Sequence, residues 1–416
     1  MRWSKSWNGP FRPLYLAALS VLGLGAISAT EANAATLNFE VAEYSSQTGP
    51  LFEKIAKDYE ALHPDVKIDI SVVPWDNVLQ QLTTDLTANT PPDLAIIGTR
   101  WLYDFASQGV VEPLDGYFPE SFKTSFIPTL MGPSIIDGKL MGLPVGSSAR
   151  AMLVNMDLLN KVGAKPPQTW DQLYDVAKKV STIPGAFGFG LQGKQIETDS
   201  YFYYILWSYG GDIFTKDGKS GLDSPEAIAA ATFYKKLLDS HVTEPEPTDY
   251  SREDIFNLFK QGKLGMVFTF PMLVPQLQAE APNLHYAVLP FPVAKQKATL
   301  AVTDSLVIFS ASHQKKLAAD FTKFMYQEKY RSQFDRNEGL LPVTTAVADE
   351  KYYSTEPMKG FVDGLSYAKF IPPVANWEQM ADDTTQALQK IYLGQAAPTA
   401  ALTQAAGQIN TILSQK

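Results

Sequence analysis

The segment DGKLMGLPVGSSARAMLVN (137–155) places two serines and an arginine between two apolar runs. A Gly-x-Ser-x-Gly elbow exposes a nucleophilic serine on a tight turn, and it needs a small residue on both sides of that serine. Gly146 precedes Ser148 by two positions, but Arg150 stands where the second glycine belongs, and no histidine lies in a motif that would supply a base. The segment therefore indicates a binding or hinge element. Gly146 would give the backbone freedom, Ser148 would face a cleft beside Ser147, and Arg150 would bind a structural carboxylate rather than the ligand.

Other reactive patterns are missing from the sequence. The chain has no cysteine, which removes thiolate nucleophiles, disulfides and a lipidated N-terminal cysteine. It also has no HExxH pair and no phosphate-binding GxxxxGK loop, so neither a metal nor a cofactor is expected. One catalytic alternative stays open: a secreted carbohydrate hydrolase needs two facing carboxylates, and Glu43, Glu197 and Asp304 lie in expected loops where a pair could form.

Aromatic and hydrogen-bonding side chains gather in these expected loops. Aromatic faces can stack on the C–H faces of a sugar, while amides, hydroxyls and guanidinium groups bind its hydroxyls. The candidate ligand-binding residues are Tyr44, Ser46, Gln47, Arg100, Trp101, Ser147, Ser148, Thr198, Ser200, Phe270 and Trp377, to which the carboxylate Asp304 is added. Each has a structural alternative; Trp101 could anchor the core, for example, and Ser147 could cap a turn.

The elements that must position these residues alternate between strand and helix. Hydrophobic periodicity predicts strands at 37–41, 66–73 and 94–97 and helices that begin near Gly49 and Asp76, the latter residue as a cap. This order is typical of an α/β lobe with a largely parallel sheet, whose ligands bind beyond the carboxyl ends of the strands. The loops 43–48 and 98–101 are expected at that edge.

A second α/β lobe is expected from the rest of the chain. The pattern predicts helices at 170–180, 201–209, 225–240, 251–260, 380–392 and 398–413, and strands at 187–191, 264–270 and 286–290.

The N-terminus has the composition of a secretory signal peptide. Three basic residues among the first twelve precede the apolar run 14–27, and Ala-Asn-Ala at 32–34 fits the cleavage pattern. The run is short for a membrane span, which takes about 20 apolar residues, so we expect cleavage after residue 34 rather than an uncleaved anchor. With no lipidated cysteine, the mature protein is expected to be soluble in a bacterial periplasm.

The length and the net charge of the chain indicate its number of domains and the partners that it does not bind. Removal of 34 of the 416 residues leaves 382. This length exceeds that of a typical domain with a single hydrophobic core, so two domains are expected. The same cleavage changes the net charge from −9 to −11. An acidic chain without a basic cluster is a poor partner for nucleic acid.

Five blocks, in order, resemble one family. They are FEKIAKDYEALHPDVKIDI, PPDLAIIGTRWLYDFASQGVVEPLD, GKLMGLPVGSSARAMLVNMDLL with PPQTWDQLYDVAKKV, FKQGKLGMVFTFPMLV and LQKIYLGQAAPTAALTQAAGQI. Together they resemble the ABC-importer extracellular solute-binding proteins of family 1, the maltose-binding-protein-like carbohydrate group. The resemblance implies an α/β fold of the periplasmic-binding-protein type II architecture, with two discontinuous lobes joined by hinge strands. Lobe 1 would comprise 35–146 plus about 303–338, and lobe 2 would comprise 147–302 plus about 339–416.

The resemblance also implies a function. The lobes would close around a carbohydrate ligand, and the closed monomer would deliver it to the membrane subunits of an ABC permease. The residues carried over are those above, together with Met272 in TFPM. Phe270-Pro271-Met272 lacks the tryptophan usual in that loop, and Arg100 and Ser148 stand where the maltose-binding relative has carboxylates. These differences argue against maltodextrin: a neutral sugar or polyol is favoured, and an anionic sugar ester is the alternative.

Overall fold

The computed structural model describes residues 34–194 and 197–415. The predicted signal peptide lies outside the described residues, except for Ala34. Among the residues described, no helix combines the length and apolar character needed to cross a membrane.

The first sheet confirms the predicted β-α-β-α-β order. Its strands are β1 (Ala35–Glu43), β2 (Val66–Pro74), β3 (Leu94–Gly98), β6 (Leu143–Ala149), β11 (Thr299–Ile308) and β12 (Ala368–Lys369). Strands β2, β1 and β3 pair in parallel, and β11 joins β3 and β6 antiparallel. The helices around this sheet are α1 (Thr48–Glu60), α2 (Trp75–Thr87), α3 (Thr99–Ser107), α12 (Lys315–Met325) and α13 (Glu328–Asn337).

The second sheet has the order β10-β7-β9-β8. Its strands are β7 (Ala151–Asn155), β8 (Phe187–Gly190), β9 (Leu264–Thr269) and β10 (Tyr286–Leu289). The longer helices of this half are α6 (Met156–Lys161), α7 (Trp170–Val180), α8 (Thr198–Ser208), α9 (Pro225–Asp239), α10 (Arg252–Lys260), α11 (Leu273–Glu280), α17 (Trp377–Tyr392) and α18 (Pro398–Leu413). The shorter elements of the chain are α4 (Glu120–Lys123), α5 (Pro128–Met131), β4 (Ile135–Ile136), β5 (Lys139–Leu140), α14 (Thr345–Ala348), α15 (Lys351–Ser354) and α16 (Met358–Val362).

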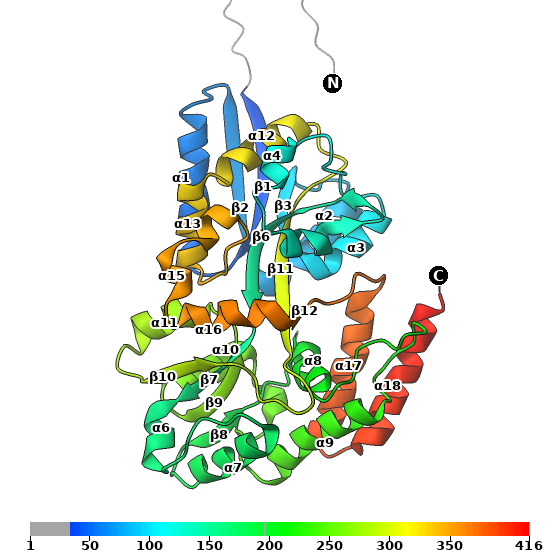
Figure 1. The fold of residues 1–416 in the computed structure, drawn as a ribbon. Helices are drawn as coiled ribbons and strands as arrows, with labels where there is room; N and C mark the ends of the chain where they lie inside the picture. Colours follow the sequence, from blue (N-terminus) through cyan, green and yellow to red (C-terminus); the bar gives the residue numbers. More distant parts are fainter. Residues whose placement is uncertain (1–33, 195–196, 416) are drawn as a thin grey trace, which may run out of the picture.

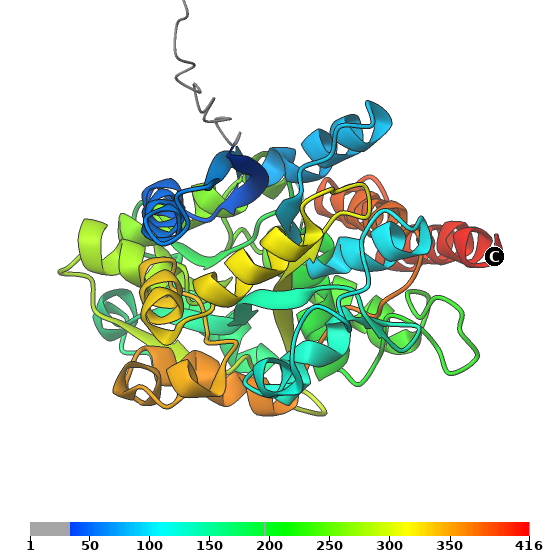
Figure 2. The same ribbon diagram turned by 90° about the horizontal axis from the view of Figure 1, so that it is seen from above.

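Two long strands connect the halves of the molecule. Figure 1 shows β6 and β11 running from the upper lobe into the lower one. Viewed from above, the blue helix α1 and the red helix α18 lie at opposite sides of the molecule (Figure 2). Strand β6 ends at Ala149, and β7 begins at Ala151 in the other sheet, so Arg150 lies at the crossing. The architecture is the predicted two-lobe α/β fold.

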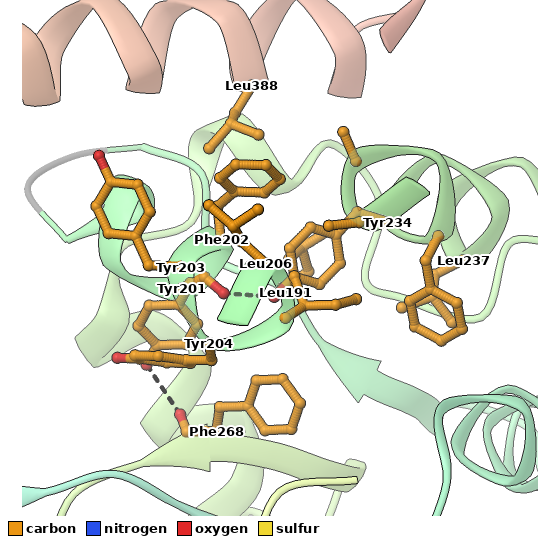
Figure 3. Close-up of a cluster of buried hydrophobic side chains, with 14 of the residues drawn as sticks. Leu191, Tyr201, Phe202, Tyr203, Tyr204, Leu206, Tyr234, Leu237, Phe268 and Leu388 are labelled. Carbon is orange, nitrogen blue, oxygen red and sulfur yellow. Dashed lines mark hydrogen bonds between the residues drawn. The ribbon is translucent and has the colours of Figure 1, made fainter. Parts of the chain in front are cut away.

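Each lobe has its own hydrophobic core, as its apolar patterns require. One core joins β1, β3 and α3 through residues such as Phe39, Ile96 and Phe105. In the second lobe, a core cluster surrounds α8, all of whose side chains are buried, Asp199 among them. Figure 3 shows two of its tyrosine hydroxyls paired with backbone: Tyr201 donates to the carbonyl oxygen of Phe268 at 2.8 Å, and Tyr234 donates to that of Tyr201 at 2.6 Å.

Several expected loops are the first turns of helices. The prediction of a loop at 98–101 is wrong, because α3 begins at Thr99. Thr198 and Ser200 likewise lie inside α8, and Trp377 begins α17. No helix was predicted at 99–107, whereas the helices predicted at 201–209 and 380–392 begin three residues earlier, because their first turns precede the apolar repeat.

Two backbone roles also differ from prediction. Pro74 occupies the N-cap position of α2, and Asp76 lies in the first turn without capping it. Gly146 lies within β6 with a hydrogen-bonded partner in β11 rather than in a flexible crossover. A Cβ there would lie 3.0 Å from Oδ2 of Asp304 and 3.2 Å from the hydroxyl oxygen of Tyr44. Glycine is therefore required for space, not for backbone freedom.

Candidate ligand-binding site

A cavity of about 140 Å³ lies between the lobes, beyond the carboxyl ends of the first-lobe strands. Its lining comprises Tyr44, Trp75, Asp76, Gly98, Thr99, Arg100, Trp101, Ser148, Arg150, Glu197, Arg252, Glu253, Phe270, Met272, Val302, Asp304 and Leu340. Both lobes therefore contribute to its wall.

The first-lobe wall is aromatic. Tyr44 follows β1 and packs edge-on against Trp75, which follows β2, with ring centroids 5.3 Å apart. Trp101, in the first turn of α3, lies 6.1 Å from Trp75. The parallel strands bring these three rings together, because each ring follows the carboxyl end of a neighbouring strand.

A carboxyl group with a raised pKa lies beside this wall. Asp304 Oδ2 accepts a hydrogen bond from the Tyr44 hydroxyl at 2.7 Å. Burial raises the pKa of Asp304 to about 7, more than the Tyr44 hydrogen bond and the charge of Arg150 lower it. Burial, reinforced by the neighbouring Asp304, also raises the pKa of Tyr44 well above its usual value. Near neutral pH, Asp304 can therefore both donate and accept hydrogen bonds.

The second-lobe wall places an aromatic ring between two guanidinium groups. The guanidinium carbons of Arg150 and Arg252 lie 4.4 and 5.0 Å from the ring centroid of Phe270. Glu197 binds both cations: Oε1 accepts from Arg150 Nη2 at 2.8 Å, and Oε2 accepts from Arg252 Nη1 at 3.0 Å. Arg150 Nη1 also donates to Ser148 Oγ at 2.5 Å. Burial alone would raise the pKa of Glu197, but the two arginines outweigh it and lower that pKa.

A third arginine is paired across the cleft. Nε and Nη2 of Arg100, on α3, donate to the two carboxylate oxygens of Glu378, on α17, at 2.5 and 2.9 Å. Nε1 of Trp101 donates to the same carboxylate at 2.7 Å. The backbone N–H of Asn376 donates to Asp104 Oδ1 at 2.9 Å, which adds a second contact between these helices.

The structure brings about half of the predicted site residues together. Those that line the cavity are Tyr44, Arg100, Trp101, Ser148, Phe270, Met272 and Asp304. Ser200 lines a smaller cavity of about 60 Å³, which shares Arg100 and Glu197 with the first. Ser147, Thr198 and Trp377 are buried, and the ring of Trp377 lies 5.8 Å from the Arg100 guanidinium carbon. Ser46 and Gln47 are exposed before α1, outside both cavity walls.

Some lining residues were missed by the sequence analysis. Trp75 and Asp76 follow β2, and the strand-end rule applied to the first and third strands would have found them. No local sequence pattern marks Arg252 or Glu378 as a site residue, because the side chains that they bind lie 55 and 278 positions away in the sequence. Across residues 34–194 and 197–415, no group of three or more His, Cys, Asp or Glu side chains is arranged to hold a metal ion.

Comparison with known proteins agrees with this fold. The family model of bacterial extracellular solute-binding proteins matches residues 43–332. A relative from Brucella abortus (strain 2308) is 48% identical over 96% of this chain and 98% of its own length. The maltotriose-binding protein of Pyrococcus abyssi is 26% identical over 77% of this chain and 70% of its own.

A solved structure has the same architecture. An ABC transporter solute-binding protein from Thermotoga lettingae, bound with α-D-tagatose, superposes with a TM-score of 0.84 at 25% identity. The alignment covers 91% of this chain and all of that protein. The chain therefore belongs to the bacterial extracellular solute-binding protein family, in the carbohydrate group of the ABC transporter proteins.

Proposed function

We propose that the protein is the periplasmic component of an ABC import system that captures a neutral sugar or polyol between its lobes. Closure of the lobes about β6 and β11 would create the form that the permease subunits recognise. Lobe 1 would comprise 35–146 plus about 303–338, and lobe 2 would comprise 147–302 plus about 339–416.

The proposal rests on the side chains that line the cavity. Tyr44, Trp75, Trp101 and Phe270 offer aromatic faces for sugar C–H groups, while Asp304 offers a carboxyl for a hydroxyl. The maltotriose-binding relative and the tagatose-bound neighbour support a carbohydrate, and the cavity volume of about 140 Å³ favours a small one.

The charges of the site support a neutral ligand. Arg100 is paired with Glu378, Arg150 with Glu197, and Arg252 with both Glu197 and Glu253. A phosphate or sulfonate ester would need one of these cations to be freed from a partly buried ion pair, which is costly. A neutral sugar hydroxyl can use the remaining hydrogen-bonding capacity without breaking a pair.

We propose capture rather than hydrolysis, although Glu197 and Asp304 both line the cavity. Each oxygen of Glu197 already accepts from a guanidinium, and the two arginines lower its pKa, which weakens it as a nucleophile or a general base. A retaining or inverting hydrolase needs that second carboxylate to be available. Release of p-nitrophenol from nitrophenyl glycosides would contradict this assignment.

We further propose that residues 1–34 are a cleaved signal peptide and that the mature protein is monomeric in the periplasm. Mass spectrometry of the exported protein would test the cleavage site, and sedimentation would test the oligomeric state.

A thermal-shift screen over neutral sugars, polyols and sugar phosphates tests the proposed ligand class. A ligand that binds only the folded state raises the melting temperature. At a ligand concentration of 100 Kd, it increases the free energy of unfolding by about 2.7 kcal/mol. We expect a neutral sugar or polyol to give the largest rise. A response confined to sugar phosphates would refute the neutral ligand, and a response to none of the carbohydrates would refute the class.

A further inference from the structure

A single carboxylate on α17 receives three donors from α3. Glu378 accepts from Nε and Nη2 of Arg100 and from Nε1 of Trp101, at 2.5–2.9 Å. Two parallel bonds between a guanidinium and a carboxylate are stronger and more specific in geometry than bonds between neutral groups. Trp101 packs in the first-lobe core, whereas Trp377, beside Glu378, packs in the second. The carboxylate therefore links the two lobes.

The surroundings make this contact more than a surface ion pair. The side chains of Arg100 and Glu378 are 16% and 31% exposed, whereas fully exposed pairs contribute little. The ring of Trp377 flanks the Arg100 guanidinium, and the Asn376–Asp104 hydrogen bond lies beside the pair. Partial burial and several charge-assisted donors raise the expected contribution.

We infer that Glu378 is a positioning residue for solute capture, acting as a latch that holds the lobes together and fixes Trp101 and Arg100 in the cavity wall. The inference rests on the proposed closure of the lobes. A contact made only when the lobes meet stabilises the closed form, and the population of that form sets the apparent affinity. In the closed form the latch also neutralises Arg100, which favours neutral solutes.

The distance between the lobes can be measured without knowing the ligand. Because the chain has no cysteine, Gln80→Cys on α2 and Gln404→Cys on α18, both exposed, give two unique spin-label sites for double electron–electron resonance. In the unliganded protein, we expect Glu378→Gln to raise the ratio of open to closed molecules about 5- to 30-fold. Asp383→Asn removes one negative charge from the same helix but leaves the Arg100 pair in place, and should leave the distances unchanged.

Further variants keep the test decisive. If Glu378→Gln does not fold by circular dichroism, Arg100→Gln removes the same pair from the other lobe. Combining Arg100→Glu with Glu378→Arg should recover part of the closed population. Superimposable distance distributions for the wild type and the pair-breaking variants would overturn the latch, as would an equal shift in Asp383→Asn.

The proposed closure can fail separately. If the strongest sugar of the thermal-shift screen shortens the wild-type distance while Glu378→Gln leaves the unliganded distribution unchanged, the latch is wrong and closure stands. If that sugar leaves the distance unchanged in both the wild type and Glu378→Gln, closure itself is refuted and the latch with it.

Discussion

Replacement of Asp304 by asparagine should change how stability depends on pH. The substitution removes the titratable group, while the amide oxygen can still accept from the Tyr44 hydroxyl, which lies 2.7 Å from the carboxylate. The pKa of Asp304 is raised from 3.8 to about 7, so the folded protein retains this proton at pH values where the unfolded chain has lost it. Stability from this group is therefore present below about pH 4 and is lost as the pH rises towards 7.

The size of the effect follows from the same pKa. A change from 3.8 to about 7 corresponds to at most about 4 kcal/mol, at 1.36 kcal/mol per tenfold change in proton affinity. Because the side chain is partly exposed to the cavity, water screens it, and we expect about 1–2 kcal/mol. At pH 8 the Asp304→Asn protein should be more stable than the wild type by that amount, whereas at pH 4 this contribution should vanish.

Urea denaturation at pH 4, 6 and 8 measures this difference. Glu244→Gln is a matched control, because burial raises the pKa of Glu244 to about 8 in the second lobe, outside the cavity. It should show the same trend in stability without changing sugar affinity, whereas Asp304→Asn should change both. A stability difference between Asp304→Asn and wild type that is equal at pH 4 and pH 8 would refute the reasoning.

Three other substitutions test the packing and the site. Trp101→Ala should weaken sugar binding by more than about 1 kcal/mol in calorimetry, because the indole lines the cavity and donates to Glu378; an unchanged affinity would assign Trp101 to the core alone. Gly146→Ala should cost about 1–3 kcal/mol in urea denaturation and weaken binding, since its Cβ would crowd the Tyr44–Asp304 pair; wild-type behaviour would show that the strands shift freely. Thr169→Ala removes the N-cap of α7 and should cost about 1 kcal/mol of stability with no loss of sugar affinity; a parallel loss of affinity would show that such variants act on binding through general unfolding.

The sequence predicted elements well where local periodicity determined them. The helices expected at 170–180 and 398–413 match α7 and α18 at both ends, because capping or proline signals bracket their apolar stripes. The start of α8 was placed three residues too late, and no helix was predicted at 99–107, since the first turns of α3 and α8 are polar or lie on the cavity wall. Propensity carries little information where tertiary contacts hold a first turn.

The site was predictable only in part. The ends of parallel strands converge, so Tyr44 and Trp101 could be placed at one edge from strand order alone. The partners of the arginines could not, because Glu197 reaches Arg150 and Arg252 only through the packing of the second lobe, and Glu378 reaches Arg100 from the other lobe. The expectation that Arg150 binds a carboxylate agrees with its pairing to Glu197, although Arg150 also lines the cavity.

Isothermal titration calorimetry of the wild-type protein, with the strongest neutral sugar of the screen and with its phosphate ester, tests the central claim most directly. We expect one sugar per chain, and an ester that binds at least about tenfold more weakly, which is 1.4 kcal/mol, because it must compete with Glu197 or Glu378 for an arginine. Tighter binding of the ester, or no saturable binding of the neutral sugar, would contradict capture of a neutral carbohydrate in this cavity.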